Sequence, residues 1–166
     1  MNKPFKIRRA TPEDFAQIWP TLQAIAAGGE VFAWPRDISL EQARHLWMEQ
    51  AAQVAFVAEH DGVFLGSYYV KPNQMGGGAH VCNAGYAVAD AARGQGVAAA
   101  LCEHSQQQAR ELGFSAMQFN FVVSSNESAV HLWTRLGFET VGRLPGAFDH
   151  PRLGPVDALV MFKRLD

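Results

Sequence analysis

The stretch Arg93-Gly94-Gln95-Gly96-Val97-Ala98 is the most informative part of this chain of 166 residues. It follows a strand-like run at 80–89 and opens a helical pattern that continues to 112. Two glycines let the backbone turn tightly, so several N–H groups point the same way beside the positive end of a helix dipole. Such a turn is an anion site suited to phosphate, although it can also be a simple packing device.

Two other phosphate-binding folds do not fit this stretch. A P-loop requires Gly-Lys followed by Ser or Thr, and here Gly96 is followed by Val97. A Rossmann fold requires its own glycine spacing and a later acidic partner, and neither accompanies this mid-chain turn.

Outward from this stretch, hydrophobic periodicity predicts strands and helices in one mixed, partly antiparallel α/β sheet. His60-Asp61-Gly62 is a strong hairpin signal, because glycine accepts the positive φ of a tight turn. Ser39 with Gln42 is typical of a capping box at a helix start. The expected strands are 6–9, 54–59, 63–70, 80–89, 115–123, 139–143 and 157–163, and the expected helices are 12–27, 40–50, 97–112 and 126–136.

Two details of this prediction concern single segments. In 115–123, Met117, Phe119 and Phe121 are expected on one face of the strand, with Gln118 and Asn120 on the other. Prolines and a glycine within 144–156 predict a long loop between the last two strands.

Composition limits the class of protein. An apolar share of 48% is enough for the core of one domain, taken as 1–166. A net charge of -2 gives no basic field for nucleic acid, and no apolar run approaches the roughly 20 residues that span a membrane. The first residues lack the apolar stretch of a secretory signal, so we expect a cytoplasmic protein. Cys82 and Cys102 have no metal-ligand spacing, which predicts two reduced, buried thiols and no metal site.

Two motifs give the chain a resemblance to the GNAT (GCN5-related N-acetyltransferase) superfamily over nearly its whole length. The first family signature, Arg/Gln-x-x-Gly-x-Gly/Ala, is matched by Arg93, Gly96 and Ala98. The second signature is matched by Asn126, Ala129, Leu132-Trp133 and Gly137-Phe138. The resemblance implies a single GNAT-like domain, with a mostly antiparallel sheet of about seven strands and about four flanking helices. It also implies transfer of an acetyl group from acetyl-CoA to an amine.

The resemblance further implies how acetyl-CoA is held. The strand ending at Ala87-Val88-Ala89 would pair its backbone with the pantetheine arm. The backbone amides of Gly94, Gln95, Gly96, Val97 and Ala98 would hold the pyrophosphate, after Arg93 of the signature. Asn126 would approach the pantetheine or the acetyl group, and a homodimer is the oligomeric state common in the family.

A narrower resemblance is to the fungal and bacterial branch that acetylates toxic proline analogues such as azetidine-2-carboxylate. It is carried by Lys71-Pro72-Asn73, by the run from His80 to Tyr86, and by Val156-Asp157-Ala158. In that branch the asparagines that match Asn83 and Asn126 position the substrate and the acetyl group.

Trp133 departs from the family pattern, because many members have a tyrosine there as the general acid for the departing thiolate. An indole can pack against the cofactor and donate one hydrogen bond, but it is no proton donor at neutral pH. Either water or an amide assists the thiolate, or another group supplies the proton. Tyr86 is a candidate by residue type, with a core or wall aromatic as the alternative.

The general base is open at this level. His80 has a suitable ordinary pKa and precedes a central strand, although a lone histidine near a loop is more often a surface residue. Glu30 and Glu59 are further candidates, each also explained as a solvent-exposed carboxylate. Asn83 cannot accept the proton, but its amide can orient the amine or polarise the thioester carbonyl.

Aromatic residues in predicted loops are candidates for the acceptor pocket. Phe32, Trp34 and Phe148 would line it, or they would cover the core instead. The leading hypothesis is therefore an N-acetyltransferase for a small-molecule amine such as an amino or imino acid. Acetylation of a protein or peptide is the alternative within the family, and an acyl-CoA-binding sensor without turnover is the alternative outside enzymes.

Overall fold

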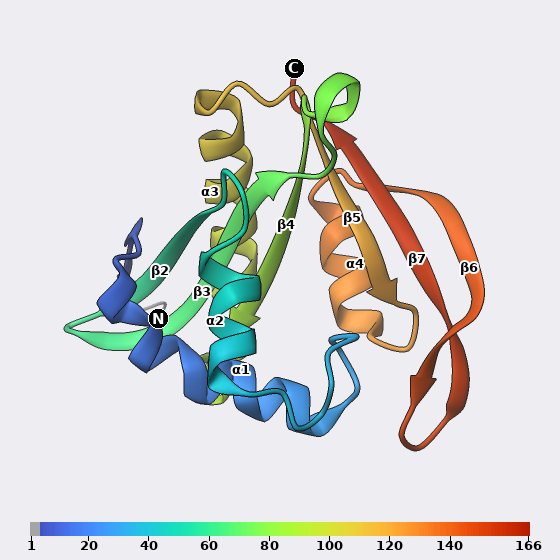
Figure 1. Ribbon diagram of the computed structural model, residues 1–166, viewed down its shortest axis with the longest axis horizontal. Helices are drawn as coiled ribbons and strands as arrows, with labels where there is room; N and C mark the ends of the chain where they lie inside the picture. Colours follow the sequence, from blue (N-terminus) through green and yellow to red (C-terminus); the bar gives the residue numbers. More distant parts are fainter. Residues whose placement is uncertain (1–3) are drawn as a thin grey trace.

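The computed structural model describes residues 4–166 as one α/β domain built on a seven-stranded sheet, drawn in Figure 1. Four α-helices flank the sheet, and three short 3-10 helices lie in the connections. The strands are β1 (Lys6–Arg9), β2 (Val54–His60), β3 (Val63–Pro72), β4 (Val81–Val88), β5 (Ala116–Val123), β6 (Glu139–His150) and β7 (Gly154–Arg164). The helices are α1 (Phe15–Gly28), α2 (Leu40–Met48), α3 (Val97–Glu111) and α4 (Glu127–Arg135). The predicted mixed sheet and its four helices are confirmed.

The order of strands places the parallel pair in the middle of the sheet. The order is β1-β2-β3-β4-β5-β7-β6, and every neighbouring pair is antiparallel except β4 and β5. β4 and β5 pair only from Val81 opposite Ala116 to Asn83 opposite Gln118. Beyond Asn83 the two strands diverge, as Figure 1 shows in the widening gap between their ribbons.

The two faces of the sheet are covered by different helices. Buried residues of α3 and α4, among them Leu101 and Trp133, share one core with Tyr68 and Met117 of the sheet. α1 and α2 form a second core with the opposite face of β2, β3 and β4. This division follows from the alternation of side chains along each strand. The space between the diverging strands β4 and β5 therefore lies between two separately packed layers of helices.

The segment 144–156 was predicted as a loop, and that prediction is wrong. β6 extends to His150 and β7 begins at Gly154, so the two strands form a long antiparallel hairpin. A register shift between Leu144 and Phe148 accommodates Pro145 and Gly146, because a bulge leaves residues out of the ladder. Pairing with β7 thus compensates for residues that disfavour a strand.

Strand β5 also departs from simple alternation. A register shift between Phe119 and Val122 places both of those side chains in the core shared with α3 and α4. Phe121 was predicted on the face of Phe119, but it contacts Phe148 of the β6–β7 hairpin at 6.2 Å between ring centroids. The bulge turns Phe121 away from that core.

Cys82 and Cys102 are buried free thiols, as predicted. Among residues 4–166, no helix is both long and apolar enough to cross a membrane.

Candidate active site

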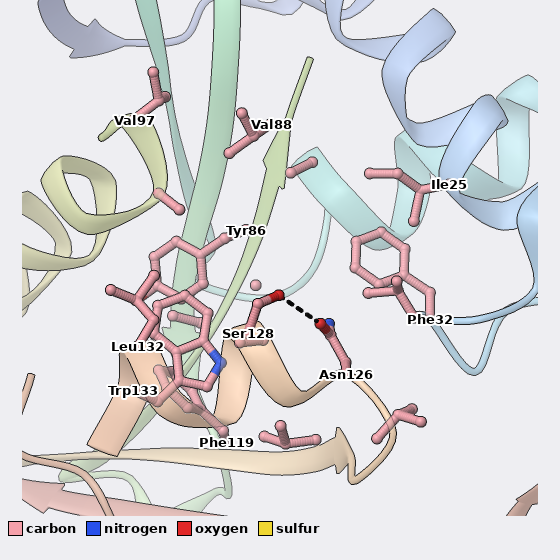
Figure 2. A pocket seen from close by; sticks show the side chains of 18 of the residues that line it. Ile25, Phe32, Tyr86, Val88, Val97, Phe119, Asn126, Ser128, Leu132 and Trp133 are labelled. Atoms are coloured by element: carbon pink, nitrogen blue, oxygen red, sulfur yellow. Dashed lines mark hydrogen bonds between the residues drawn. The ribbon is translucent and has the colours of Figure 1, made fainter. Parts of the chain in front are cut away.

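The divergence of β4 and β5 opens a cavity of about 710 Å³, which we call the main cavity. Its walls come from 84–88 of β4, 119–123 of β5, the start of α3, α4, and the segment between α1 and α2. Figure 2 shows side chains from several elements around this space, with Ile25 and Phe32 facing Asn126 and Ser128. Different elements form the two ends of this cavity: the start of α3 at one end and the segment between α1 and α2 at the other.

One end of the cavity is the turn before α3. Gly94 and Gly96 have φ of +76° and +79°, a backbone region that favours glycine. The first bond at the helix start runs from the Ala100 N–H to the Gly96 carbonyl at 3.1 Å. The N–H groups of residues 97–99 precede that bond and have no partner one turn earlier. With the helix dipole, they have the geometry of an anion site, and phosphate binding there stays a prediction.

The side chains of this turn take different directions. Arg93 lines the cavity, and its Nε lies 3.2 Å from Asp90 Oδ1. Gln95 folds back and donates a hydrogen bond to the Ala91 carbonyl at 3.1 Å, and its side chain is not among those that line the cavity. Gln95 can therefore contribute to the anion site only through its backbone.

The β4 edge that faces β5 is unpaired along the cavity. On its other edge, β4 stays paired with β3 as far as Val88 opposite Gly66. On the β5 side, pairing stops at Asn83. The backbone groups of 84–88 that point toward β5 are thus available to an extended ligand, which could add as a short strand. Ala87 and Val88, predicted to contact the cofactor, lie on this edge.

Aromatic rings form the wall beside this edge. Trp133 of α4 lies between Tyr86 and Phe119, with ring centroids at 5.0 and 5.2 Å. The indole is 9% exposed, and Figure 2 shows it together with Leu132 on one side of the cavity. Trp133 therefore lies where it can pack against a ligand in the cavity.

Tyr86 directs its hydroxyl away from that space. The Tyr86 hydroxyl and Ser105 Oγ of α3 are 2.6 Å apart, and burial raises the Tyr86 pKa well above its ordinary value. Ser105 in turn donates to the Cys102 carbonyl at 2.7 Å. The Tyr86 ring lines the cavity while its hydroxyl is held in the core, which favours the wall role over the acid role.

Asn83 lies at the vertex where β4 and β5 separate. Its Nδ2 donates to the Gln118 carbonyl at 3.0 Å, and its Oδ1 accepts from the Tyr69 hydroxyl at 3.4 Å. Both ends of this buried amide are therefore engaged within the protein. Asn83 joins the two diverging strands and holds the phenol of Tyr69.

Tyr69 was not identified from the sequence. It lines the cavity, and burial raises its pKa to about 12, so the phenol is neutral at physiological pH. Its ring lies across Gly85, where an added Cβ would be 2.6 Å from Tyr69 Cε1. The feature that places Tyr69 in the site is its pairing with Gly85. That pairing depends on the register between β3 and β4, which the sequence alone does not give.

Asn126 precedes α4, yet its side chain makes no cap hydrogen bond. Its Oδ1 accepts from Ser128 Oγ at 3.3 Å, drawn as the dashed line in Figure 2. Both residues line the cavity, so the Asn126 amide is exposed to a ligand there. Ser128 is a second polar residue that the sequence did not single out.

The predicted acceptor aromatics line two neighbouring cavities. Phe32 and Trp34, 5.1 Å apart between ring centroids, line the main cavity. Phe148 lines a second cavity of about 340 Å³. The two cavities share Phe32, Ala33, Trp34 and Phe121, so these residues form a common wall.

The three candidate bases lie outside the main cavity. His80 is exposed before β4, at the end where β4 and β5 are paired, and its carbonyl accepts from the Ser115 N–H. Glu59 accepts from Arg8 Nε at 3.0 Å, and Glu30 accepts from Arg152 Nε at 2.9 Å. Within the described chain, the titratable side chains that line the cavity are Tyr69, Tyr86, Arg93 and Arg135.

No group of three or more His, Cys, Asp or Glu residues that could hold a metal ion occurs in the part of the chain that the structure describes.

Comparison with known proteins identifies the family. The Acetyltransferase (GNAT) family model matches residues 15–138. The structure of a GCN5-related N-acetyltransferase from Kribbella flavida is 42% identical and has a TM-score of 0.91, covering 96% of this chain and 97% of that one. The N-acetyltransferase aca1 of Schizosaccharomyces pombe is 35% identical over 83 residues, which are 50% of this chain and 40% of that protein. This chain thus matches less than half the length of that curated relative.

A more distant structure has the same fold. The phosphinothricin acetyltransferase Pat from Sinorhizobium meliloti, solved in complex with AcCoA, has a TM-score of 0.84 at 19% identity. That likeness covers 99% of this chain and 89% of that one. With the family match over 15–138 and the Kribbella flavida relative, the finding is that this chain belongs to the acetyltransferase (GNAT) family.

Proposed function

We propose that this protein transfers the acetyl group of acetyl-CoA to the amine of a small molecule, an amino or imino acid. The observation that carries the proposal is the main cavity between β4 and β5. One end offers helix N-terminal amides for the pyrophosphate, and the wall offers an unpaired strand edge for the amides of pantetheine. In acetyl-CoA the pyrophosphate is followed by the amides of pantetheine, so the molecule matches these two sites in order.

In the proposed reaction the amine nitrogen attacks the thioester carbonyl and forms a C–N bond. The C–S bond then breaks and CoA leaves as a thiolate, while the nitrogen keeps the acetyl group and loses one proton, which water carries to the thiolate to give the free thiol. The amine must be neutral to attack, and no carboxylate or imidazole lines the cavity in the described chain. We therefore propose that the amine binds as its free base and that water or an amide assists the thiolate.

Three residues have proposed roles in this reaction. Asn126 is positioned to hydrogen-bond the pantetheine or the acetyl group, and Trp133 to pack against the cofactor. Asn83 acts by fixing Tyr69 and the vertex of the two strands. One N–H and one lone pair of this amide remain, and Asn83 lines the main cavity, so the direct contact with the amine that the sequence suggested stays a prediction beside this role.

The boundaries of the second cavity support a small acceptor over a peptide. The segment between α1 and α2 forms one side, and the β6–β7 hairpin forms the other. The ion pair of Glu30 with Arg152, at 2.9 Å, joins these two segments. A peptide acceptor requires an open groove, and we propose that this bridge narrows the approach beside the second cavity. The homodimer and the cytoplasmic location stay predictions.

Release of free thiol tests this function. The protein is incubated with acetyl-CoA and, separately, with amino acids, imino acids, simple amines and short peptides. We expect thiol release with at least one small acceptor and none with the peptides. Release with peptides alone would favour the peptide N-acetyltransferase, and binding of acetyl-CoA without release for any amine would favour a sensor.

A further inference from the structure

The second cavity contains one basic side chain. Arg36, from the segment between α1 and α2, lines it together with Asp149 of β6. The remaining lining is apolar or aromatic apart from backbone, and it includes the wall shared with the main cavity. Because Phe32 and Phe121 line both cavities, a ligand that reached past them from the main cavity would approach Arg36.

The stem of Arg36 is held in place by the end of α1. Its Nε donates to the Ala27 carbonyl at 2.9 Å, where the negative end of the helix dipole favours a cation. Its Cδ lies 2.9 Å from the point where a Cβ on Gly29 would be. Gly29 has φ of +67°, so a larger residue there would be strained and would also displace the stem. The two terminal nitrogens remain for a ligand.

The charges around Arg36 leave its guanidinium without a carboxylate partner. In the described chain, no ion pair within 4 Å involves Arg36. Asp37 is its neighbour in the sequence, and Asp149 lines the same cavity. Glu30, the next acid on this segment, is paired with Arg152 and lies 4.0 Å from His150 Nε2. A planar guanidinium with two free nitrogens matches a carboxylate with two oxygens.

We propose that Arg36 binds the carboxylate of the acceptor, so that the acceptor is an amino or imino acid whose amine points into the main cavity. This inference rests on the proposed function and assigns the specificity of the same site. The shared wall of Phe32, Trp34 and Phe121 then contacts the carbon skeleton between the two polar groups. Arg36 is a binding residue in this proposal and has no part in the transfer of protons.

The test compares each acid with its carboxamide as acceptor. The panel holds azetidine-2-carboxylate, proline, and α-, β- and γ-amino acids, so that the separation of amine and carboxylate varies, together with diamines of similar length. We expect the wild-type kcat/KM to favour the acid over the carboxamide by about 10- to 100-fold, the range for a charged hydrogen bond. In Arg36→Gln that preference should disappear through loss of activity on the acid, while the KM for acetyl-CoA stays the same.

Two further variants separate this role from a general effect of charge or fold. Arg36→Lys should keep part of the preference, because it retains the charge without the bidentate geometry. Arg164→Gln removes the same charge from an exposed position on β7 outside both cavities and should leave the preference intact.

Specific results would overturn the inference. Equal kcat/KM for acids and carboxamides in the wild type, or an equal loss on both in Arg36→Gln, would contradict it while the proposed function stands. A preference for diamines would show that Asp149 sets the charge of the acceptor instead. No turnover with any amine would contradict the proposed function itself.

Discussion

Tyr86 and Tyr69 have rings on the same cavity but hydroxyls on opposite faces of the sheet. The Tyr86 hydroxyl bonds to Ser105 of α3, and the Tyr69 hydroxyl donates to Asn83 on the side of α1 and α2. By residue type, either tyrosine could act as the general acid, a role that Trp133 cannot fill. The direction of the hydroxyl makes Tyr86 a wall residue and leaves Tyr69 as the tyrosine that faces the acceptor side.

Tyr86→Phe should therefore have little effect on the reaction. We expect kcat to change by less than about 3-fold, whereas the loss of a general acid typically costs about 100-fold or more. Steady-state thiol release measures kcat, and the KM for acetyl-CoA reports whether the wall has moved. A fall of kcat by about 100-fold in a folded variant with unchanged KM would contradict the wall role.

At the scale of elements, the vertex of β4 and β5 controls the shape of the site. Asn83 bridges the strands at their last paired position and also holds Tyr69. Replacing it with alanine leaves the Gln118 carbonyl and the Tyr69 hydroxyl without their partner, which costs free energy in a buried place. The anion site before α3 is formed by other residues and should be less affected.

We expect Asn83→Ala to lower kcat by about 10-fold or more while the Kd for acetyl-CoA changes by less than about 3-fold. Asn73→Ala is the matched control, because Asn73 also bridges to β5, through Asn120 Nδ2 at 2.7 Å, at an exposed position. It should leave both constants unchanged. An equal loss of turnover and of cofactor binding in Asn83→Ala would show that the residue supports the fold alone.

Most elements could be predicted because their local signals agree with their tertiary contacts. Ser39 accepts from the Gln42 N–H at 3.1 Å, as the capping box predicted. The β6–β7 hairpin could not be predicted, since Pro145 and Gly146 disfavour a strand and only pairing with β7 compensates. The same holds for Phe121, whose orientation depends on a bulge in β5.

At the scale of the molecule, the two ends of the site differ in how far the sequence reveals them. The candidate anion site is one continuous turn, so glycines and a following helix were enough to predict its backbone geometry. The acceptor side combines Phe32 and Arg36 of one segment with Tyr69 and Phe121 of strands far from it in the chain. Their proximity depends on the sheet register and on the path between α1 and α2. No local pattern encodes it.

The most direct test of the account is a calorimetric titration of acetyl-CoA against Gly96→Glu. A glutamate there would block the approach of phosphate to the amides and add a repelling charge. Gly62→Glu is the control for backbone strain, since Gly62 has φ of +76°, close to the +79° of Gly96, and lies in the β2–β3 turn with open space around it. We predict that Gly96→Glu raises the Kd by about 100-fold or more while Gly62→Glu binds as the wild type does. A folded Gly96→Glu variant with wild-type affinity would contradict the assignment of the cofactor site.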